Sequence, residues 1–170
     1  MIDTGKFSDE MVAFAQADLK AVDRSITPWV IANFHRPMYC VGDAECNVGL
    51  SFATRLKRAL EDTFYDEGVD LVINGHIHAY QRSYPVYREA VRSQEYWDAR
   101  APVHIVQGAS GNREGQKGTI NTDAPWSAFH LEGEDCVGYG ILTVAKHTMT
   151  WQYFSSSTGA ILDEITFKRT

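Results

Sequence analysis

The sequence has no long apolar run and no excess of basic residues. No stretch approaches the roughly 20 apolar residues needed to span a bilayer, and no apolar segment typical of a signal peptide follows the charged opening residues. Sixteen lysine and arginine residues stand against 22 aspartate and glutamate residues, for a formal net charge of −6. Because phosphate backbones select basic surfaces, we expect no nucleic acid as a partner. The lack of a long apolar run leads us to expect no membrane as a partner.

Cysteine is scarce, with three residues in a chain of 170. Cys40 and Cys46 lie close together in an expected loop, whereas Cys136 stands alone. A local disulfide between the first two would imply an oxidising compartment. Three unrelated thiols in a cytosolic protein fit the composition equally well, so the cysteine count leaves both alternatives open.

The first half of the chain alternates helical and strand-like patterns. Ser8 starts a helix in which Met11, Phe14, Ala15, Leu19 and Val22 recur at helical spacing. A second apolar helix face runs over residues 52–64. The segments Trp29–Phe34 and Val69–Ile73 are expected to be short buried strands. Strand, helix and strand in this order predict a βαβ unit of a parallel sheet, with an α/β fold.

The second half, from about residue 90, is richer in strand-like runs. Residues 102–107 form one such run, and turn signals separate the later ones, which predicts an antiparallel meander. The four expected meander strands are Trp126–Leu131, Tyr139–Ala145, Met149–Ser155 and Ala160–Lys168. Because no linker-like segment divides the halves, we expect one domain over residues 1–170, with a βαβ part at 1–90 and a β part at 91–170.

Three histidines are expected to meet at one edge of the sheet. His35 follows the first predicted strand, His76 follows the second, and ligands of parallel α/β sheets bind beyond the carboxyl ends of strands. His78 would point the same way as His76 in extended backbone, roughly 6–7 Å away. That separation suits ligands of two neighbouring metal ions. A single histidine at a strand end is more often a structural loop residue, which remains the interpretation for His104, His130 and His147.

Two segments resemble purple acid phosphatases, which are calcineurin-like metallophosphoesterases. They are Trp29–Cys40 (WVIANFHRPMYC) and Val69–Tyr80 (VDLVINGHIHAY), and Pro102–Gly115 with the closing run from Trp126 is also similar to the terminal part of that family. The resemblance implies a four-layer αββα sandwich, of which this chain would be the carboxy-terminal half. It also implies hydrolysis of phosphate monoesters, a secreted or vacuolar (lysosomal) location, and a disulfide between Cys40 and Cys46, with Cys136 outside any disulfide within the chain.

The same resemblance implies a dinuclear centre that pairs Fe(III) with iron, zinc or manganese. By motif position, His35 and His76 resemble ligands of the divalent ion, and His78 resembles a ligand of the ferric ion. Candidates for contact with these ligands or with the substrate phosphate are Gln81, Arg55 and Tyr80. Gln81 stands where the family usually has glutamate, and on a helix surface Arg55 is more often simply solvated. No histidine occurs between Tyr39 and Leu56, so the general acid is unidentified.

The carboxylate, tyrosine and asparagine motifs that supply the other ligands in the family (GDxG, GDxxY and GNHE) do not occur in this sequence. The chain is therefore expected to be a fragment of a longer protein, one part of a complex, or a non-catalytic structural or interaction protein derived from the fold. In the first two cases an amino-terminal fragment or another chain would cover the open edge of the sheet. Neutral imidazoles alone should hold at most one divalent ion, and the isolated chain should be nearly inactive.

Overall fold

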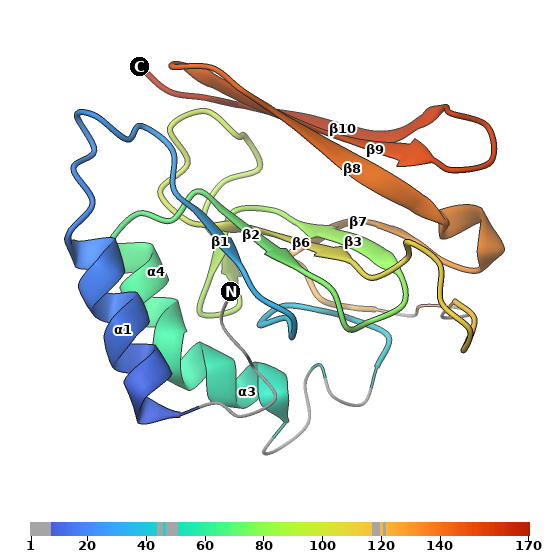
Figure 1. The fold of residues 1–170 in the computed structure, drawn as a ribbon, viewed down its shortest axis with the longest axis horizontal. Helices are drawn as coiled ribbons and strands as arrows, with labels where there is room; N and C mark the ends of the chain where they lie inside the picture. The colour runs from blue at the N-terminus through green and yellow to red at the C-terminus, as the bar shows by residue number, and fades with distance from the viewer. Residues whose placement is uncertain (1–7, 44–45, 47–50, 117–119, 121) are drawn as a thin grey trace.

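The computed structural model describes residues 8–43, 46, 51–116, 120 and 122–170, which form three layers. Helices cover one face of a five-stranded central sheet, and a separate three-stranded sheet covers the other face (Figure 1). This arrangement confirms a mixed α/β fold. It also corresponds to part of the four-layer sandwich, because the outer face of the three-stranded sheet carries no helical layer among the described residues.

The central sheet has the strand order β1-β2-β6-β3-β7. The first three strands are parallel, with Ala32 opposite Val72 and Val72 opposite His104, so the predicted βαβ unit is confirmed. Strand β3 runs antiparallel to both β6 and β7. The strands are β1 (Ile31–Asn33), β2 (Leu71–Asn74), β6 (Val103–Gln107), β3 (Tyr80–Ser83) and β7 (Ser127–Leu131).

Two expectations about this sheet are wrong. The first predicted meander strand forms β7, which pairs with β3 in the central sheet and not with the later strands. Local alternation indicates a strand but carries no information about which sheet it joins. Strand β1 is not buried, because it lies at the sheet edge with β2 as its neighbour, and Ile31 is 39% exposed.

The remaining predicted meander strands form the second sheet, in the order β10-β9-β8 with antiparallel pairing throughout. Its inner face packs on the central sheet through a cluster that includes Trp151, Tyr153, Phe167, Tyr80 and Ile105. The strands are β8 (Gly138–Val144), β9 (Thr148–Ser155) and β10 (Ile161–Lys168), and a 3-10 turn (Glu134–Cys136) precedes β8. A small separate hairpin, formed by β4 (Val86–Tyr87) and β5 (Ala90–Val91), precedes β6 in the chain.

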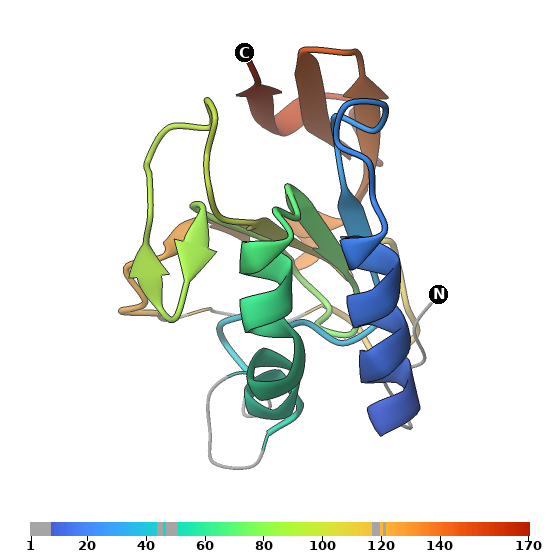
Figure 2. The same cartoon turned by 90° about the vertical axis from the view of Figure 1, so that its left-hand side faces the viewer.

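The helices lie side by side on the opposite face of the central sheet (Figure 2). Helix α1 (Asp9–Lys20) begins at Ser8, whose hydroxyl accepts a hydrogen bond from the amide of Met11 at 3.4 Å. The second helical segment consists of α3 (Phe52–Leu56), a π-helical turn (Lys57–Glu61) and α4 (Asp62–Asp66). Its end is followed by Gly68 in the left-handed region, at φ +65°.

Helix α1 buries fewer of its apolar residues than its sequence pattern predicts. Ala15 is its one buried residue, whereas Phe14 is 65% exposed. Neighbouring helical residues lie about 100° apart around the axis, so a helix that buries Ala15 turns Phe14 toward solvent.

Within the described part of the chain, no helix is both long and apolar enough to cross a membrane.

Candidate metal centre

The backbone around β1 and β2 brings His35 and His76 together. Pairing continues past the strand ends, since the amide of Phe34 donates to the Ile73 carbonyl at 3.2 Å and that of Gly75 donates to the His35 carbonyl at 2.9 Å. The buried Asn74 side chain adds a third bond, from Nδ2 to the Phe34 carbonyl at 2.8 Å. These bonds hold both histidines at the carboxyl edge of the parallel strands, as predicted from the sequence.

The two imidazoles have a geometry that suits one metal ion. Nε2 of His35 lies 3.3 Å from Nδ1 of His76, and the rings meet edge-on with centroids 5.1 Å apart. Two nitrogens that each bind a tetrahedral Zn²⁺ at 2.0–2.1 Å are themselves about 3.3–3.4 Å apart. His35 is exposed and His76 is half-buried, so an ion would have access from solvent. The pair therefore fits two corners of a divalent site.

The segment that carries His78, the third predicted ligand, is bent where an extended backbone was expected, and His78 does not form a three-ligand cluster with His35 and His76 among the described residues. His76 has φ +65°, and hydrogen bonds of 2.8 Å from the Ile77 amide to the Gly75 carbonyl and from the Ala79 amide to the Ile77 carbonyl bend the segment. The backbone is not extended, so the spacing argument for His76 and His78 is wrong. Ile77 is 2% exposed and packs in the core. His78 keeps a half-buried side chain, with Nδ1 3.9 Å from Oε2 of Glu114.

The described residues contain no cluster of three or more histidine, cysteine, aspartate or glutamate side chains arranged to hold a metal ion. Two nitrogens from neutral imidazoles give an ion too few ligands and no compensating negative charge. Among the described residues, the pair therefore supplies two candidate nitrogen ligands and no anionic one.

The loop that carries His78 is braced by Gly108, which directly follows β6. A Cβ atom at this position would lie 1.9 Å from the Ile77 carbonyl oxygen and 2.7 Å from the Ile77 carbonyl carbon. Only glycine allows two backbones to approach this closely. The Gly108 amide also donates to the Ala79 carbonyl at 3.2 Å. The segment after β6 thus sets the position of the His76–His78 loop.

Gln81 contacts neither histidine and instead fixes the backbone at Val41. Its Oε1 accepts from the Val41 amide at 2.9 Å, and its Nε2 donates to the Val41 carbonyl at 2.8 Å. A glutamate would retain the first bond, but an ionised carboxylate has no donor for the second. The amide at position 81 is therefore matched to this contact, which holds the chain one residue after Cys40.

Tyr80 points away from the histidines, into the interface between the two sheets. Its hydroxyl donates to Oδ2 of Asp163 at 2.6 Å and accepts from Nε1 of Trp151 at 3.0 Å, while its ring stacks on Tyr153 at 3.8 Å. Burial and the neighbouring Asp163 raise the pKa of Tyr80 far above its usual range. Its position therefore indicates a structural role.

Arg55 is exposed, and it is Arg36 that lies next to the His35–His76 pair. The Arg36 guanidinium lies 3.6 Å above the Phe52 ring, and its Nη1 is 3.1 Å from Nε2 of His76. Arg55 lies 5.8 Å from the same ring. Arg36 was not among the predicted site residues, although it directly follows His35 in the sequence.

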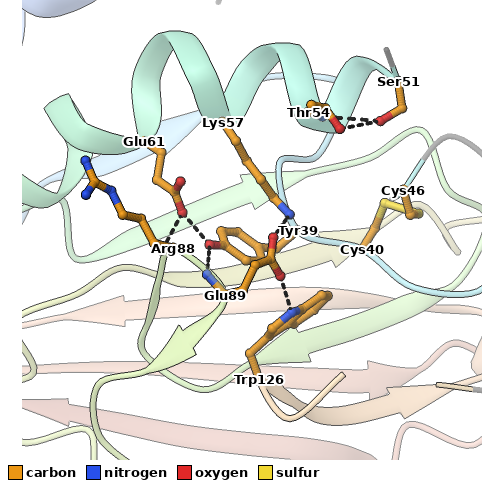
Figure 3. A network of polar contacts seen from close by, with 10 residues as sticks. All are labelled: Tyr39, Cys40, Cys46, Ser51, Thr54, Lys57, Glu61, Arg88, Glu89 and Trp126. Atoms are coloured by element: carbon orange, nitrogen blue, oxygen red, sulfur yellow. Dashed lines mark hydrogen bonds and ion pairs between the residues drawn. A yellow bond between two sulfur atoms is a disulfide. The ribbon is translucent and has the colours of Figure 1, made fainter. Parts of the chain in front are cut away.

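A polar network anchors the segment that follows His35 (Figure 3). The Tyr39 hydroxyl donates to Oε1 of Glu61 and accepts from the Glu89 amide at 3.1 Å. Lys57 lies 4.1 Å above the Tyr39 ring and pairs with Glu89, which also accepts from Nε1 of Trp126 at 2.7 Å. The π-helical turn, the β4–β5 turn and Trp126 thus hold Tyr39 from three sides.

His104 lies beneath this network, with its ring 4.7 Å from that of Tyr39. Burial, and to a smaller extent the charge of Lys57, lowers the pKa of His104 to about 3. The imidazole therefore remains neutral at pH 5–6. It is fully enclosed and cannot serve as the general acid that the sequence left unidentified.

The predicted disulfide between Cys40 and Cys46 is present (Figure 3). Together with Gln81 and Tyr39 it restrains the chain just beyond His35. Cys136 is buried and present as a thiol, as expected, with its Sγ 3.9 Å from Oε1 of Gln116.

The known proteins that this chain resembles are acid phosphatases. Residues 101–164 match the family model described as "Iron/zinc purple acid phosphatase-like protein C". The chain is 33% identical over 168 residues to acid phosphatase A of Cryphonectria parasitica, a match that covers 97% of this chain and 32% of that protein. It is 34% identical over 171 residues to acid phosphatase type 7 of Danio rerio, covering 89% and 38%, respectively.

The fold of this chain also matches that of a solved acid phosphatase structure. The chain superposes on a purple acid phosphatase from yellow lupin (Lupinus luteus) seeds with a TM-score of 0.81 and 26% identity, over 96% of this chain and 29% of that one. The chain thus spans about a third of the length of the relatives that it matches.

Proposed function

Because this chain belongs to the purple acid phosphatase family, we propose that it carries one part of a metal-dependent phosphomonoesterase site. The observation that carries the proposal is the 3.3 Å separation between Nε2 of His35 and Nδ1 of His76. This spacing fits two ligands of one divalent ion. His78 is assigned to a second ion, which would be Fe(III) beside iron, zinc or manganese.

In this proposal the chain binds and orients, and further ligands complete the centre. Bound metal would act as a Lewis acid on phosphoryl oxygens and activate a water for attack on the phosphate ester. Two cations a few ångströms apart repel strongly, so a dinuclear centre requires anionic ligands that imidazoles do not supply. We assign these ligands to an amino-terminal fragment or another chain that pairs with β1, which is supported by the exposure of Ile31 at the sheet edge.

We also assign the protein to a secreted or vacuolar (lysosomal) compartment. The Cys40–Cys46 disulfide supports this assignment, since such bonds persist in oxidising surroundings.

A second candidate function is a non-catalytic structural or interaction protein that retained the fold. It is favoured by one observation, the incomplete set of metal ligands among the described residues. The two candidates differ in what His76 does. A ligand should control metal affinity, whereas a structural loop residue should not.

The test is a paired assay of metal binding and hydrolysis. Zn²⁺ affinity by equilibrium dialysis and turnover of para-nitrophenyl phosphate at pH 5–6 with iron, zinc or manganese would be measured for the chain and for His76→Ala. We expect at most one bound ion, lost in the variant, and little or no turnover by the chain alone. His147→Ala, in the exposed β8–β9 turn, is the matched control and should behave as the unmodified chain.

Zn²⁺ affinity that is equal in the chain and in His76→Ala would favour the non-catalytic alternative. Robust turnover that disappears in His76→Ala would instead show that the chain alone completes the site, which would contradict the need for further ligands.

A further inference from the structure

The two edge strands of the three-stranded sheet differ in how they are protected. Strand β10 carries the charged residues Asp163, Glu164 and Lys168, and its register with β9 is irregular after Ile161. At its end, the backbone of Lys168 bonds to residues 96–98 at 3.0 and 2.9 Å. Charged side chains, irregular register and a covering segment all keep another strand from adding to an edge.

Strand β8 forms the opposite border of this sheet and has none of these features (Figure 1). Its seven residues, Gly138–Val144, include no charged residue and no proline, and their register with β9 is continuous. A long, regular and uncharged edge is a template for pairing with another strand.

The backbone groups of β8 alternate between β9 and the open side. The Ala145 amide donates to the Thr148 carbonyl at 2.8 Å, and the Ser156 amide donates to the Val137 carbonyl at 3.0 Å. Because bonded pairs alternate along an antiparallel ladder, the odd-numbered residues between these two bonds face β9. The even-numbered residues therefore face away from it.

Three even-numbered residues leave the edge open. The Gly138 amide donates outward to the Ala109 carbonyl at 3.0 Å, which covers the start of the strand. The backbone amides and carbonyls of Gly140, Leu142 and Val144 have no hydrogen-bond partner among the described residues. These three residues present a row of donors and acceptors that an added strand could satisfy.

Apolar side chains are exposed along the same strand. Tyr139 is 46% exposed, Ile141 44% and Val144 51%. On the outer face Phe154 stacks on Tyr139, with ring centroids 5.5 Å apart. An added strand would therefore cover apolar surface as well as satisfy backbone groups.

The charges at the two ends of β8 favour a second copy of this chain as the added strand. Exposed Glu134 precedes the strand, and exposed Lys146 follows it. Antiparallel pairing of two copies brings the acidic end of each beside the basic end of the other, whereas parallel pairing brings like charges together. The paired residues themselves are neutral, although each chain carries a net charge of −6.

We propose that β8 is a self-pairing edge, through which two copies of this chain join antiparallel into one continuous sheet. Pairing centred on Leu142 places Gly140 of one copy opposite Val144 of the other, so that every open backbone group of the edge gains a partner. The same surface serves both copies, as a two-fold dimer requires. The inference goes beyond the proposed function and does not depend on the metal pair.

The first test is sedimentation equilibrium of the metal-free chain at roughly 1 µM to 1 mM. Val144→Pro removes an outward N–H that makes no bond to β9, and proline is tolerated at such edge positions. Because a symmetric dimer loses two donors, we expect its dissociation constant to rise roughly 30-fold. Val144→Ala keeps the amide and should stay within about fivefold of the unmodified chain. Thermal unfolding checks that both variants fold.

An unmodified chain that stays monomeric up to about 1 mM would overturn the inference, and the edge would then belong to a strand of a different chain. A chain that dimerises equally well with Val144→Pro would also overturn it, as would a loss of dimers that is equal in Val144→Ala and Val144→Pro.

The second test reads backbone pairing directly by amide hydrogen exchange. The amides of Gly140, Leu142 and Val144 should exchange fast in dilute samples and slow down as the protein concentration rises. The amides of Ile141 and Thr143, which face β9, should be slow at every concentration. Dimers in which all five amides ignore concentration would place the interface elsewhere.

The third test concerns the direction of pairing. Glu134→Lys and Lys146→Glu should each weaken dimerisation by roughly two- to fivefold at low salt, since each places like charges side by side. Combining the two substitutions exchanges the charges and should restore the dissociation constant to within about twofold of the original. A combined variant no better than either single one would contradict antiparallel pairing of β8.

Discussion

Asp163→Ala is expected to lower the free energy of unfolding by about 3–5 kcal/mol, because it leaves a buried cation without its partner. Asp163 lies on β10 and is 8% exposed. It accepts from Nε and Nη2 of Arg82 at 2.7 and 2.9 Å and from the Tyr80 hydroxyl at 2.6 Å. The Arg82 side chain is itself only 10% exposed. This cluster joins the three-stranded sheet to β3, so urea unfolding should report the full loss.

Two further variants identify the cause of that loss. Glu164→Ala, on the same strand but exposed and bonded to Gln152, should change the free energy of unfolding by no more than about 0.5 kcal/mol. The double variant Arg82→Met with Asp163→Leu should be milder than Asp163→Ala, because no unpaired charge remains. A double variant as unstable as Asp163→Ala would show that packing between the sheets, and not the uncompensated charge, causes the loss.

Gly108→Ala is expected to cost about 3 kcal/mol of stability and to displace the loop that carries His76 and His78. The added methyl would meet the backbone of Ile77 at 1.9 Å, and a backbone atom has no rotamer by which to avoid it. The separation between the segment after β6 and this loop must therefore increase. Chemical denaturation should show the lost stability, and Zn²⁺ affinity should fall in parallel.

Gly115→Ala provides the comparison, since Gly115 has φ +79° and, beyond its chain neighbours, no atom of the described residues lies within 4 Å of the position a Cβ would take. Backbone strain alone should cost about 1 kcal/mol there and leave Zn²⁺ affinity unchanged. Equal effects of the two substitutions would mean that close contact with Ile77 does not position the loop.

The sequence was sufficient to predict the βαβ unit and the meeting of His35 with His76. Both follow from local signals, since apolar periodicity identifies the elements and parallel strands deliver their carboxyl ends to one edge. The sheet membership of β7 was not predictable in this way. Residues 127–131 alternate as any strand does, and their pairing with β3 is decided by contacts with residues 44 to 51 positions earlier in the chain.

Within the candidate site, the errors concern backbone shape and distant partners. The prediction for His78 requires an extended segment, but the positive φ of His76 bends it. The contact of Gln81 with Val41 spans 40 residues, and no local pattern signals it. Arg36 was predictable in principle, because a residue directly after a strand-end histidine must lie near whatever that histidine contacts.

The most direct test of the central claim is X-ray absorption spectroscopy of the Zn²⁺-loaded chain at the zinc edge. The account predicts two imidazole nitrogens at about 2.0–2.1 Å per bound ion, with oxygen from water in the remaining positions. His35→Ala and His76→Ala should each remove one imidazole from the spectrum, while His147→Ala should remove none. A zinc environment that keeps both imidazoles in His35→Ala or in His76→Ala would contradict the assignment of these two residues as the ligand pair.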